Sequence, residues 1–566
     1  MLTYDAGFWE KIKEEERYKP LLESLNNLYG EWCEEPPKSL KYSEFKLFYE
    51  TGDRKTYETS YFLHRKQLAV SAVMYLIYRK EADRSYLEDV LWAICDEYSW
   101  CVPAHIQGES AEERFKTIDL FASETAFSLG ELVSLMGDAL DETVRTRVRY
   151  EIRRRVIQPF LNAGWWWEKA TNNWASVCAC QVAGAILYTQ PALFPKVKPR
   201  IEAAMHSFLN SFGNDGACLE GVSYWIYGFG MFALYHELLT DVEPDATAVF
   251  QDEKVKNIAM FFQKSCLRGG IAVTFSDCQP QALYSLAIGH YLKRIYGDDV
   301  KLPPFQYHLP LERSASFPML VRAFLYYDPA DNGNEQACFE YYLPDAQWYI
   351  RQTERYSFAA KGGHNDESHN HNDIGSFLLC RNGRQILCDI GVGLYTKDYF
   401  PPETRYTFLG NSSRGHSVPR INGQEQRAGS SYCAREVRYE RHMFSADILG
   451  AYGMPGSLTR TFETLEDRVR LTDTYRLEAN PESIAERFVS YEKPKLEEGR
   501  ISWKDLTLYY PAEMLKVEIG KETYENNFMG IFTVYLIDLK VIAPKQNMKI
   551  KLEFVTEPDH TFKKEF

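Results

Sequence analysis

The hydrophobic pattern of this sequence changes its period near residue 300, and that change constrains the fold more than any other feature. Before it, apolar residues recur at helical spacing, as Leu68, Val70, Val73, Met74 and Ile77 do within residues 64–79. Short loops make consecutive helices pack as antiparallel pairs, and no repeat of fixed length indicates a solenoid. We therefore expect an α/α toroid over residues 1–310. The other helical windows are residues 86–98, 111–136, 142–157, 174–188, 199–212, 227–239, 254–267 and 282–296.

Residues 296–318 form the predicted connection, because four prolines and a cluster of charges interrupt the helical period there. Beyond it the period is two. Residues 376–380 and 384–389 flank Asn382-Gly383, a two-residue turn typical of a β-hairpin. The sequence thus predicts an α+β protein in which an antiparallel β-sandwich over residues 318–566 follows the toroid. The other strand windows are residues 348–352, 356–360, 435–439, 457–463, 468–476, 506–510, 532–538 and 548–555.

The balance of charges limits the partners. Lys and Arg number 65 against 79 Asp and Glu, which gives a net charge of −14 and disfavours nucleic acid or an anionic membrane. No apolar run approaches the roughly 18 residues that a membrane span needs. The N-terminal segment lacks the basic, apolar and small-residue regions of a signal peptide, so we expect a cytoplasmic protein.

The segment KGGHNDESHNHNDIGSF, residues 361–377, holds the densest cluster of histidines. If it is extended, His369 and His371 share one face. Asp389 closes the following hairpin strand, and His416 lies in RGHSVPRINGQ. Two imidazoles and a carboxylate from adjacent strands make a candidate Zn²⁺ site with an open fourth position. The alternative is a polar loop of hydrogen-bonded histidines.

Two further segments combine aromatic and polar side chains. In WWWEKATNNWASVCACQ, residues 165–181, the amides of Asn172 and Asn173 stand beside indole rings that suit a sugar, although either residue could simply cap the helix. In NDGACLEGVSYWIYGFG, residues 214–230, Tyr224 begins a helix and either projects into a cleft or packs in the core. His105, in WCVPAH, either lines the same cleft or packs.

These motifs together resemble the heparinase II/III-like polysaccharide lyases, which include alginate and glycosaminoglycan lyases. The matching pieces are WCVPAH, TNNW, DG…EGVSYWIYG, HNHNDIGSF, ILCDIGVGLYTKDYF and RGHSVPRINGQEQ, spread over residues 100–426. The resemblance implies an N-terminal α/α toroid, a C-terminal antiparallel β-sandwich and β-elimination at a uronic acid. Removal of the C5 proton builds charge beside the carboxylate, so the reaction needs donors to that carboxylate, a base, and an acid for the glycosidic oxygen.

The resemblance also implies roles for particular residues. Asn173 neutralises the carboxylate with help from Asn172, Tyr224 is the base and a candidate acid, and His369 is its partner. Tyr227, one turn later, is the rival to Tyr224, and Trp174 stands where some relatives carry a histidine. We expect His105, Asn172, Trp174, Tyr227 and Arg405 to contact substrate. One Zn²⁺ or similar divalent ion, mainly structural, is expected at His371, Asp389 and His416, with no organic cofactor.

The expected partner is an acidic oligosaccharide, and the oligomeric state stays open, homo-oligomers included. A glycosaminoglycan fragment of heparin, heparan or chondroitin type is the first choice of substrate, and alginate or another bacterial uronate glycan the second. A glycoside hydrolase using Glu220 and Asp215 is an alternative, because α/α toroids also host paired carboxylates. A noncatalytic glycan-binding protein is a third.

Overall fold

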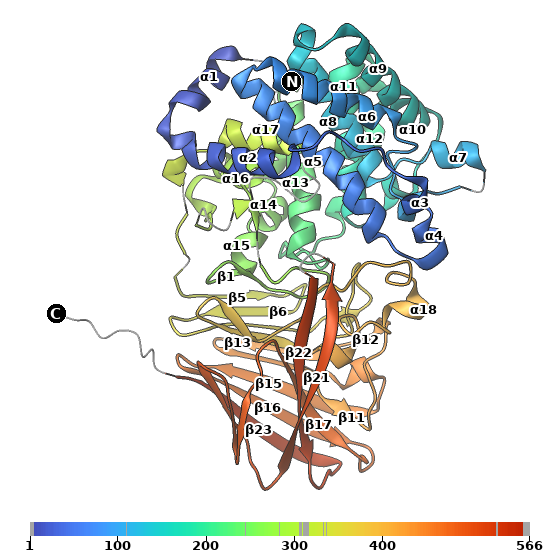
Figure 1. Cartoon of the computed structure of the whole chain (residues 1–566). Helices are drawn as coiled ribbons and strands as arrows, with labels where there is room; N and C mark the ends of the chain where they lie inside the picture. Colours follow the sequence, from blue (N-terminus) through green and yellow to red (C-terminus); the bar gives the residue numbers. More distant parts are fainter. Residues whose placement is uncertain are drawn as a thin grey trace, which may run out of the picture.

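The computed structural model describes residues 5–108, 110–243, 245–281, 283–304, 308–309, 316–331, 333–335, 337–527 and 530–557. Helices form the part of the molecule drawn in blue to yellow-green, and sheets form the part drawn in yellow to red below it (Figure 1). The predicted change from helices to antiparallel sheets is therefore confirmed. Within the described residues, no helix is long and apolar enough to cross a membrane.

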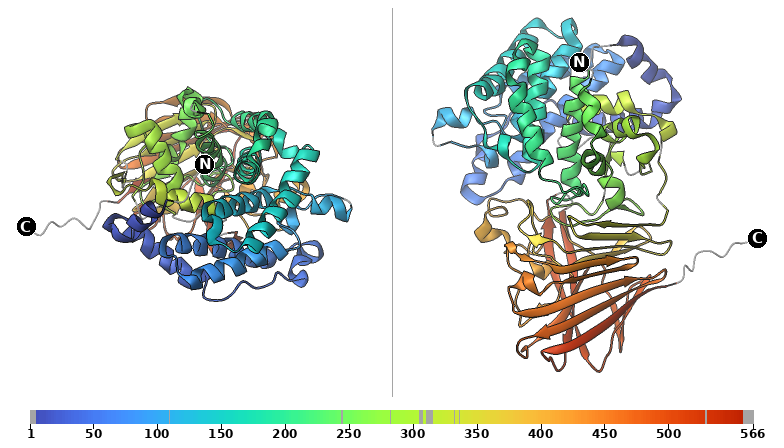
Figure 2. Two further views of the ribbon diagram at one scale, coloured as in Figure 1. Left: turned by 90° about the horizontal axis from the view of Figure 1, so that it is seen from above. Right: turned by 180° about the vertical axis from the view of Figure 1, so that it is seen from behind.

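The helices contact one another in a sequence that returns to its start. From α5 the contacts run through α6, α9, α8, α11, α13, α16 and α17, and α17 packs against α5 again, while α2 and α12 pack on α5 and α11 (Figure 2). Their bounds are α1 (Ala6–Glu14), α2 (Lys19–Trp32), α3 (Tyr42–Phe45), α4 (Leu47–Thr51), α5 (Lys55–Tyr78), α6 (Glu81–Asp96), α7 (Ala111–Phe115), α8 (Leu120–Met136), α9 (Glu142–Ile152), α10 (Gln158–Asn162), α11 (Asn173–Thr189), α12 (Phe194–Leu209), α13 (Val222–Leu239), α14 (Glu253–Ala259), α15 (Phe261–Ser265), α16 (Leu286–Tyr296), α17 (Phe317–Tyr326) and α18 (Pro402–Arg405).

Three larger antiparallel sheets make up the second part. One has the order β10 (Arg384–Leu387), β9 (Phe377–Arg381), β7 (Ser357–Lys361), β6 (Trp348–Gln352), β5 (Phe339–Leu343). Another has the order β11 (Arg420–Ile421), β17 (Ile484–Ser490), β22 (Gly530–Val541), β21 (Leu515–Asn526). The largest has the order β13 (Arg435–Glu440), β14 (Met443–Asp447), β15 (Gly456–Thr464), β16 (Arg468–Leu477), β23 (Asn547–Thr556), β20 (Leu506–Tyr509), β19 (Arg500–Ser502), β18 (Lys495–Glu497). Two-stranded pairs are β1 (Cys266–Leu267) with β2 (Ile271–Ala272), β3 (Tyr284–Ser285) with β4 (His308–Leu309), and β8 (His364–Asn365) with β12 (Gly429–Cys433).

The five-stranded sheet joins the two parts because both of its faces are buried. Along β6, Trp348 and Ile350 belong to the hydrophobic core of the helices, while Tyr349 between them belongs to the core shared by the sheets. Side chains alternate across a strand, so a strand covered on both faces is buried along its whole length, as β6 is. This sheet therefore lies directly beneath the helices, between their hydrophobic core and that of the other sheets.

Several elements depart from the sequence-based expectations. The helical window 111–136 divides into α7 and α8, because Asp119 caps α8 by accepting from the backbone of Phe121 and Ala122. The window 254–267 ends in β1. In the expected connection, residues 305–307 and 310–315 lie outside the described residues, and α17 after them packs with α5, α8 and α16. By its contacts, α17 belongs to the helical part.

Candidate active site

A cavity of about 780 Å³ lies where the helices meet the sheets. Its wall includes Asn173 from α11, Tyr224 from α13 and His369 from the loop after β8. Residues 395–397 and 400–401, between β10 and α18, close another side. Binding sites of this volume take ligands of a few hundred daltons. The motifs singled out in the sequence thus converge on one space although nearly 200 residues separate them.

Tyr224 and His369 touch directly. Their rings stack with centroids 4.0 Å apart, and the Tyr224 hydroxyl lies 2.6 Å from the Tyr395 hydroxyl. Tyr224 lies in the first turn of α13, which begins at Val222 directly after Gly221, whose φ of 106° suits glycine and turns the chain into the helix. The Tyr224 phenol and the His369 imidazole therefore stand side by side on the cavity wall, where one ligand can form hydrogen bonds with both.

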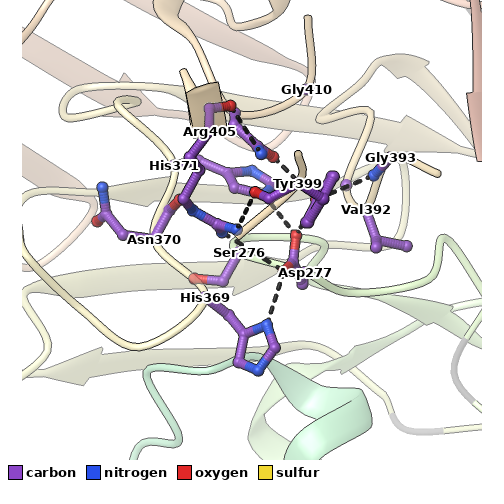
Figure 3. A network of polar contacts seen from close by, with 12 residues as sticks. Ser276, Asp277, His369, Asn370, His371, Val392, Gly393, Tyr399, Arg405 and Gly410 are labelled. Carbon is purple, nitrogen blue, oxygen red and sulfur yellow. Dashed lines mark hydrogen bonds and ion pairs between the residues drawn. The ribbon is translucent and has the colours of Figure 1, made fainter. Parts of the chain in front are cut away.

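Asp277 holds two histidines at once (Figure 3). Its Oδ2 lies 2.7 Å from His369 Nδ1, and its Oδ1 lies 3.0 Å from His371 Nε2. Burial alone would raise the pKa of this carboxyl, but Arg405 and the two histidines hold that pKa well below its usual range. An ionised carboxylate only accepts hydrogen bonds, so each ring donates the N–H that faces Asp277. In the neutral form of each ring, the other nitrogen, His369 Nε2 or His371 Nδ1, carries a lone pair.

The backbone around this carboxylate is held in an unusual conformation. His369 has φ of 60° and Ser276 has φ of 65°, and both values lie in the left-handed region that residues other than glycine rarely adopt. The H-x-H segment is therefore not the extended strand that the sequence suggested, and the two imidazoles meet at Asp277 because the chain turns at His369. Such conformations persist where surrounding contacts over-determine them, and they concentrate at functional sites.

Asn172 and Asn173 occupy different positions at the start of α11. Asn172 is the N-cap, and its side chain accepts from the backbone of Trp174 at 3.1 Å. The backbone of Asn173 donates to Glu220 Oε1 at 3.0 Å, while its buried side-chain Oδ1 has no hydrogen-bond partner. Burial raises the pKa of Glu220, against the opposing effects of His369 and the Asn173 N–H. The Asn173 side chain therefore has hydrogen-bonding capacity left for a ligand in the cavity, and its Nδ2 is the atom that could donate to an acidic group.

His371, Asp389 and His416 lie together, fully buried, with one ligand atom of each within 4.8 Å of the other two. His416 Nε2 lies 2.7 Å from the Gly410 carbonyl oxygen and His416 Nδ1 lies 3.0 Å from Asp389 Oδ2; both partners only accept, and Asp389 accordingly raises the pKa of His416, so without a bound cation the ring donates from both nitrogens. His371 Nδ1 has no hydrogen-bond partner. A bound cation would replace the proton on His416 Nδ1 and meet three acceptors, and the outer hydrogen bonds to Asp277 and Gly410 are those that orient metal-binding histidines.

Of the remaining predicted residues, three line the cavity and one, Arg405, does not. His105, Trp174 and Tyr227 line the cavity, where His105 Nδ1 lies 2.9 Å from Asp119 and its ring packs edge-on to Trp174. Arg405 does not line it: the guanidinium is buried, 3.4 Å from Asp277, and donates to the Asn370 carbonyl. It was expected to contact substrate, but its position is that of a counter-ion beneath the site.

Sequence reasoning did not single out Asp277, Tyr395 or Tyr399. The Tyr399 hydroxyl donates to Asp277, and the Tyr395 hydroxyl lies 3.4 Å from the same carboxylate. Both tyrosines stand in ILCDIGVGLYTKDYF, one of the motif segments, so the resemblance could have drawn attention to them. Asp277 lies in VTFSDCQ, where nothing local distinguishes it from an ordinary loop aspartate.

Residues 341–502 match a family model described as heparinase II/III-like, C-terminal, which confirms the resemblance that the motifs predicted. No curated protein sequence matches the chain. Similar folds occur in a mutant of the heparan sulfate lyase HepC from Pedobacter heparinus, at 14% identity and a TM-score of 0.60 over 97% of this chain and 90% of that one. Heparinase III matches at 13% identity and a TM-score of 0.62, over 89% of this chain and 78% of that one. A third match is the Streptomyces coelicolor A3 chondroitin AC lyase in complex with chondroitin sulphate. Its identity is 11% and its TM-score 0.57, over 98% of this chain and 82% of that one.

Proposed function

From the heparinase II/III-like C-terminal domain of this chain, we propose that the protein is a polysaccharide lyase that cleaves uronic-acid-containing glycans by β-elimination. The observation that carries the proposal is the contact of Tyr224 with His369 on the cavity wall that Asn173 also lines. A glycosaminoglycan of heparin, heparan or chondroitin type is the substrate class we favour. Support for it comes from the compared structures, whose names refer to heparan sulfate, heparin and chondroitin.

In this proposal His369 and Tyr224 move the two protons, with His369 as the base and Tyr224 as the acid, whereas the resemblance implied Tyr224 as the base. The lone pair on His369 Nε2 accepts the C5 proton of the uronate, because Asp277 engages the N–H on the opposite nitrogen. The Tyr224 phenol donates its proton to the departing glycosidic oxygen. Tyr395, 2.6 Å from that phenol, can donate to the phenolate that remains, which regains a proton from solvent while His369 Nε2 releases to solvent the proton that it took.

Asn173 neutralises the uronate carboxylate. Removal of the C5 proton spreads negative charge onto the carboxylate oxygens, and a fixed amide donor stabilises that charge more strongly than the ground state. Lys397, which lines the same cavity, adds positive charge for the acidic groups of the glycan, whereas Arg54 there is paired with Glu58 at 2.7 Å. Such a local cation allows a protein of net charge −14 to take an acidic substrate.

A divalent ion, Zn²⁺ by our proposal, would be held by His371, Asp389 and His416. Such an ion would supply a fixed positive centre that ties together the loop after β8, the end of the hairpin and the loop before β11. The chemistry of the donors fits, because imidazole and carboxylate are the ligands that zinc prefers. His369 remains outside this set and free for proton transfer.

We also propose the finer architecture and setting. The returning circuit of helices would be an α/α toroid that extends past the expected boundary at residue 310 to include α17, and the sheets that follow would be the β-sandwich expected within residues 318–566. The cytoplasmic location, and with it an imported acidic oligosaccharide as substrate, stays a prediction.

The hydrolase alternative needs two carboxylates facing one substrate. Asp215 instead accepts from the backbone of Ala217, Asp345 and Ala346, and it is absent from the residues that line the cavity. Glu220 is buried against Asn173. These contacts favour elimination over hydrolysis, because hydrolysis requires a second carboxylate beside the scissile bond.

The test is incubation with heparan sulfate, chondroitin sulfate and alginate while near-ultraviolet absorbance is recorded. Elimination leaves a conjugated unsaturated uronate that absorbs, and we expect this signal with a glycosaminoglycan, absent with Tyr224→Phe. New reducing ends without the absorbance would instead establish hydrolysis. Binding without either product would establish a glycan-binding protein.

A further inference from the structure

A group of aromatic side chains stands on the surface beside the cavity. This aromatic surface consists of Tyr42 and Phe45 on α3, Tyr49 on α4, Tyr98 after α6 and Phe115 at the end of α7, along one edge of the helical part (Figure 1). Tyr42 is 76% exposed, Tyr49 48%, Tyr98 52% and Phe115 44%. Ring contacts connect them through Phe45, whose centroid lies 5.8 Å from Tyr49 and 5.4 Å from Tyr98, and Tyr98 lies 4.8 Å from Phe115.

The aromatic surface is continuous with the cavity by two routes. Phe48 lines the cavity and its ring lies 5.3 Å from that of Tyr49. The Tyr49 hydroxyl donates to the Pro103 carbonyl at 3.1 Å, and the next two residues, Ala104 and His105, again line the cavity. A ligand that leaves the cavity on this side therefore meets these rings next.

The concentration of rings at this place is unusual for the molecule. Of fourteen large apolar side chains exposed in the described part of the chain, four lie on the aromatic surface, and Trp166 and Phe400 line the cavity itself. Single exposed apolar residues need no explanation, whereas a contiguous patch marks a binding surface. Arg114 lies close enough to act electrostatically on Tyr49, whose pKa burial raises and Arg114 lowers.

We propose that the aromatic surface binds the sugar residues of the substrate glycan that extend beyond the cavity. The inference rests on the proposed function and deepens it, because it assigns the protein to chains longer than the cavity holds. The C–H face of a pyranose packs on an exposed ring, while the hydroxyls of Tyr42 and Tyr98 can meet sugar hydroxyls, and the terminal nitrogens of Arg114, whose Nε donates to the Gly108 carbonyl, can meet carboxylate or sulfate groups. Rings held by contacts with one another lose little freedom when they bind.

The test compares glycan lengths in the double variant Tyr98→Ala/Phe115→Ala. Heparan sulfate polymer and its size-fractionated tetrasaccharide serve as substrates, with chondroitin sulfate used in the same way if the protein cleaves that glycan. We expect KM for the polymer to rise about tenfold, with KM and kcat for the tetrasaccharide unchanged, since two stacking contacts are lost only by the longer chain. The control is Tyr150→Ala, an exposed tyrosine on α9 away from these rings, which should change neither value.

The inference would be overturned if the double variant had the wild-type KM for both glycan lengths, or if its KM rose for both. If no glycan is cleaved, retardation of the protein in gels containing heparan sulfate polymer replaces kinetics. Retardation weakened by the double variant alone would support the surface although the lyase proposal had failed, and retardation unaffected by it would overturn the surface too. Light scattering completes the test: a wild-type dimer that the double variant converts to monomers would identify the aromatic surface as a contact between copies and overturn glycan binding.

Discussion

Two buried networks of charged side chains lie in this protein, one at the cavity and one inside the sheets. At the cavity, Asp277 meets Arg405, His369 and His371. Inside the sheets, Arg460 of β15 forms ion pairs with Asp473 of β16 and Glu486 of β17. Both are almost completely buried, and in both the pKa of a carboxyl is far from its ordinary value: Asp277 well below it, Glu486 well above it through burial and the neighbouring Asp473.

The two networks differ in what they leave unsatisfied. Arg460 uses its Nε and both terminal nitrogens on the two carboxylates and on the carbonyls of Gly375 and Ser417, and Tyr475 donates to Glu486 at 2.6 Å. At the cavity, by contrast, His371 Nδ1 and Asn173 Oδ1 have no hydrogen-bond partner, and His369 lines an open space. A carboxyl with a shifted pKa thus occurs in both the structural and the functional network. The functional network is distinguished by polar atoms that lack a hydrogen-bond partner and lie close to a cavity.

The closed network also supports the open one. Gly375 follows the HNHND segment that carries His369 and His371, and Ser417 follows His416. Because Arg460 donates to both carbonyls, at 3.1 and 2.8 Å, it holds the two site loops against the sheet. The comparison therefore predicts loss of chemistry from changes in the first network and loss of stability from changes in the second.

The largest effect is expected from Tyr224→Phe. Removal of the phenol proton should reduce kcat by about 10²–10⁴-fold, the usual contribution of a general acid or base, with little change in melting temperature. The matched control is Tyr227→Phe, one turn later on α13 and also in the cavity wall. Full activity of Tyr224→Phe together with an inactive Tyr227→Phe would move the assignment one turn along the helix.

Arg460→Met should show the opposite pattern. It leaves Asp473 and Glu486 buried without their cation, so we expect the free energy of unfolding to fall by about 3–5 kcal/mol, measured by urea denaturation. Activity per folded molecule should stay within a few-fold of wild type. Arg470→Met is the control, because Arg470 pairs with Glu553 on the exposed face of the same sheet and should cost at most about 1 kcal/mol.

Asp277→Asn tests whether the carboxylate positions His369. The amide can donate to the imidazole and select the wrong tautomer, so we expect kcat to fall by about 10²–10³-fold. A merely structural role would leave the pH profile of kcat/KM unchanged, whereas a positioning role should shift its acidic limb. An unchanged profile with a lowered melting temperature would remove Asp277 from the mechanism.

The sequence predicted the parts of this site that local pattern and family resemblance can carry. The period change gave the helices and most strands, and the motifs gave Asn173, Tyr224, His369 and the three candidate metal ligands. Asp277 was missed because its role comes entirely from tertiary contacts with residues at least 90 positions away. The strand β17 was missed because it is buried on both faces and shows no alternation, and β21 was missed although residues 515–519 alternate, because its continuation is mostly polar and exposed.

A smaller effect on turnover is expected from Asn173→Ala. Loss of one donor to the developing charge should reduce kcat by about 10²-fold and change KM much less. Asn172→Ala removes the helix cap instead and should cost about 1 kcal/mol of stability. If Asn173→Ala lowered the melting temperature with unchanged turnover, its backbone contact with Glu220 would be its whole role.

The smallest effect on chemistry is expected from removal of the divalent ion. Protein purified without added metal should contain about one equivalent by elemental analysis, held by His371, Asp389 and His416. A chelator should lower the melting temperature, and Zn²⁺ should restore it, because the ion binds the folded chain and ties three segments together. Activity should fall only as far as the histidine loop loses order, since His369 keeps its contact with Asp277. Substoichiometric metal, with no thermal shift from chelator or Zn²⁺, would mean that a proton on His416 fills the same place. The buried triad would then belong with the Arg460 network, as a closed structural cluster beneath an active site that needs no metal.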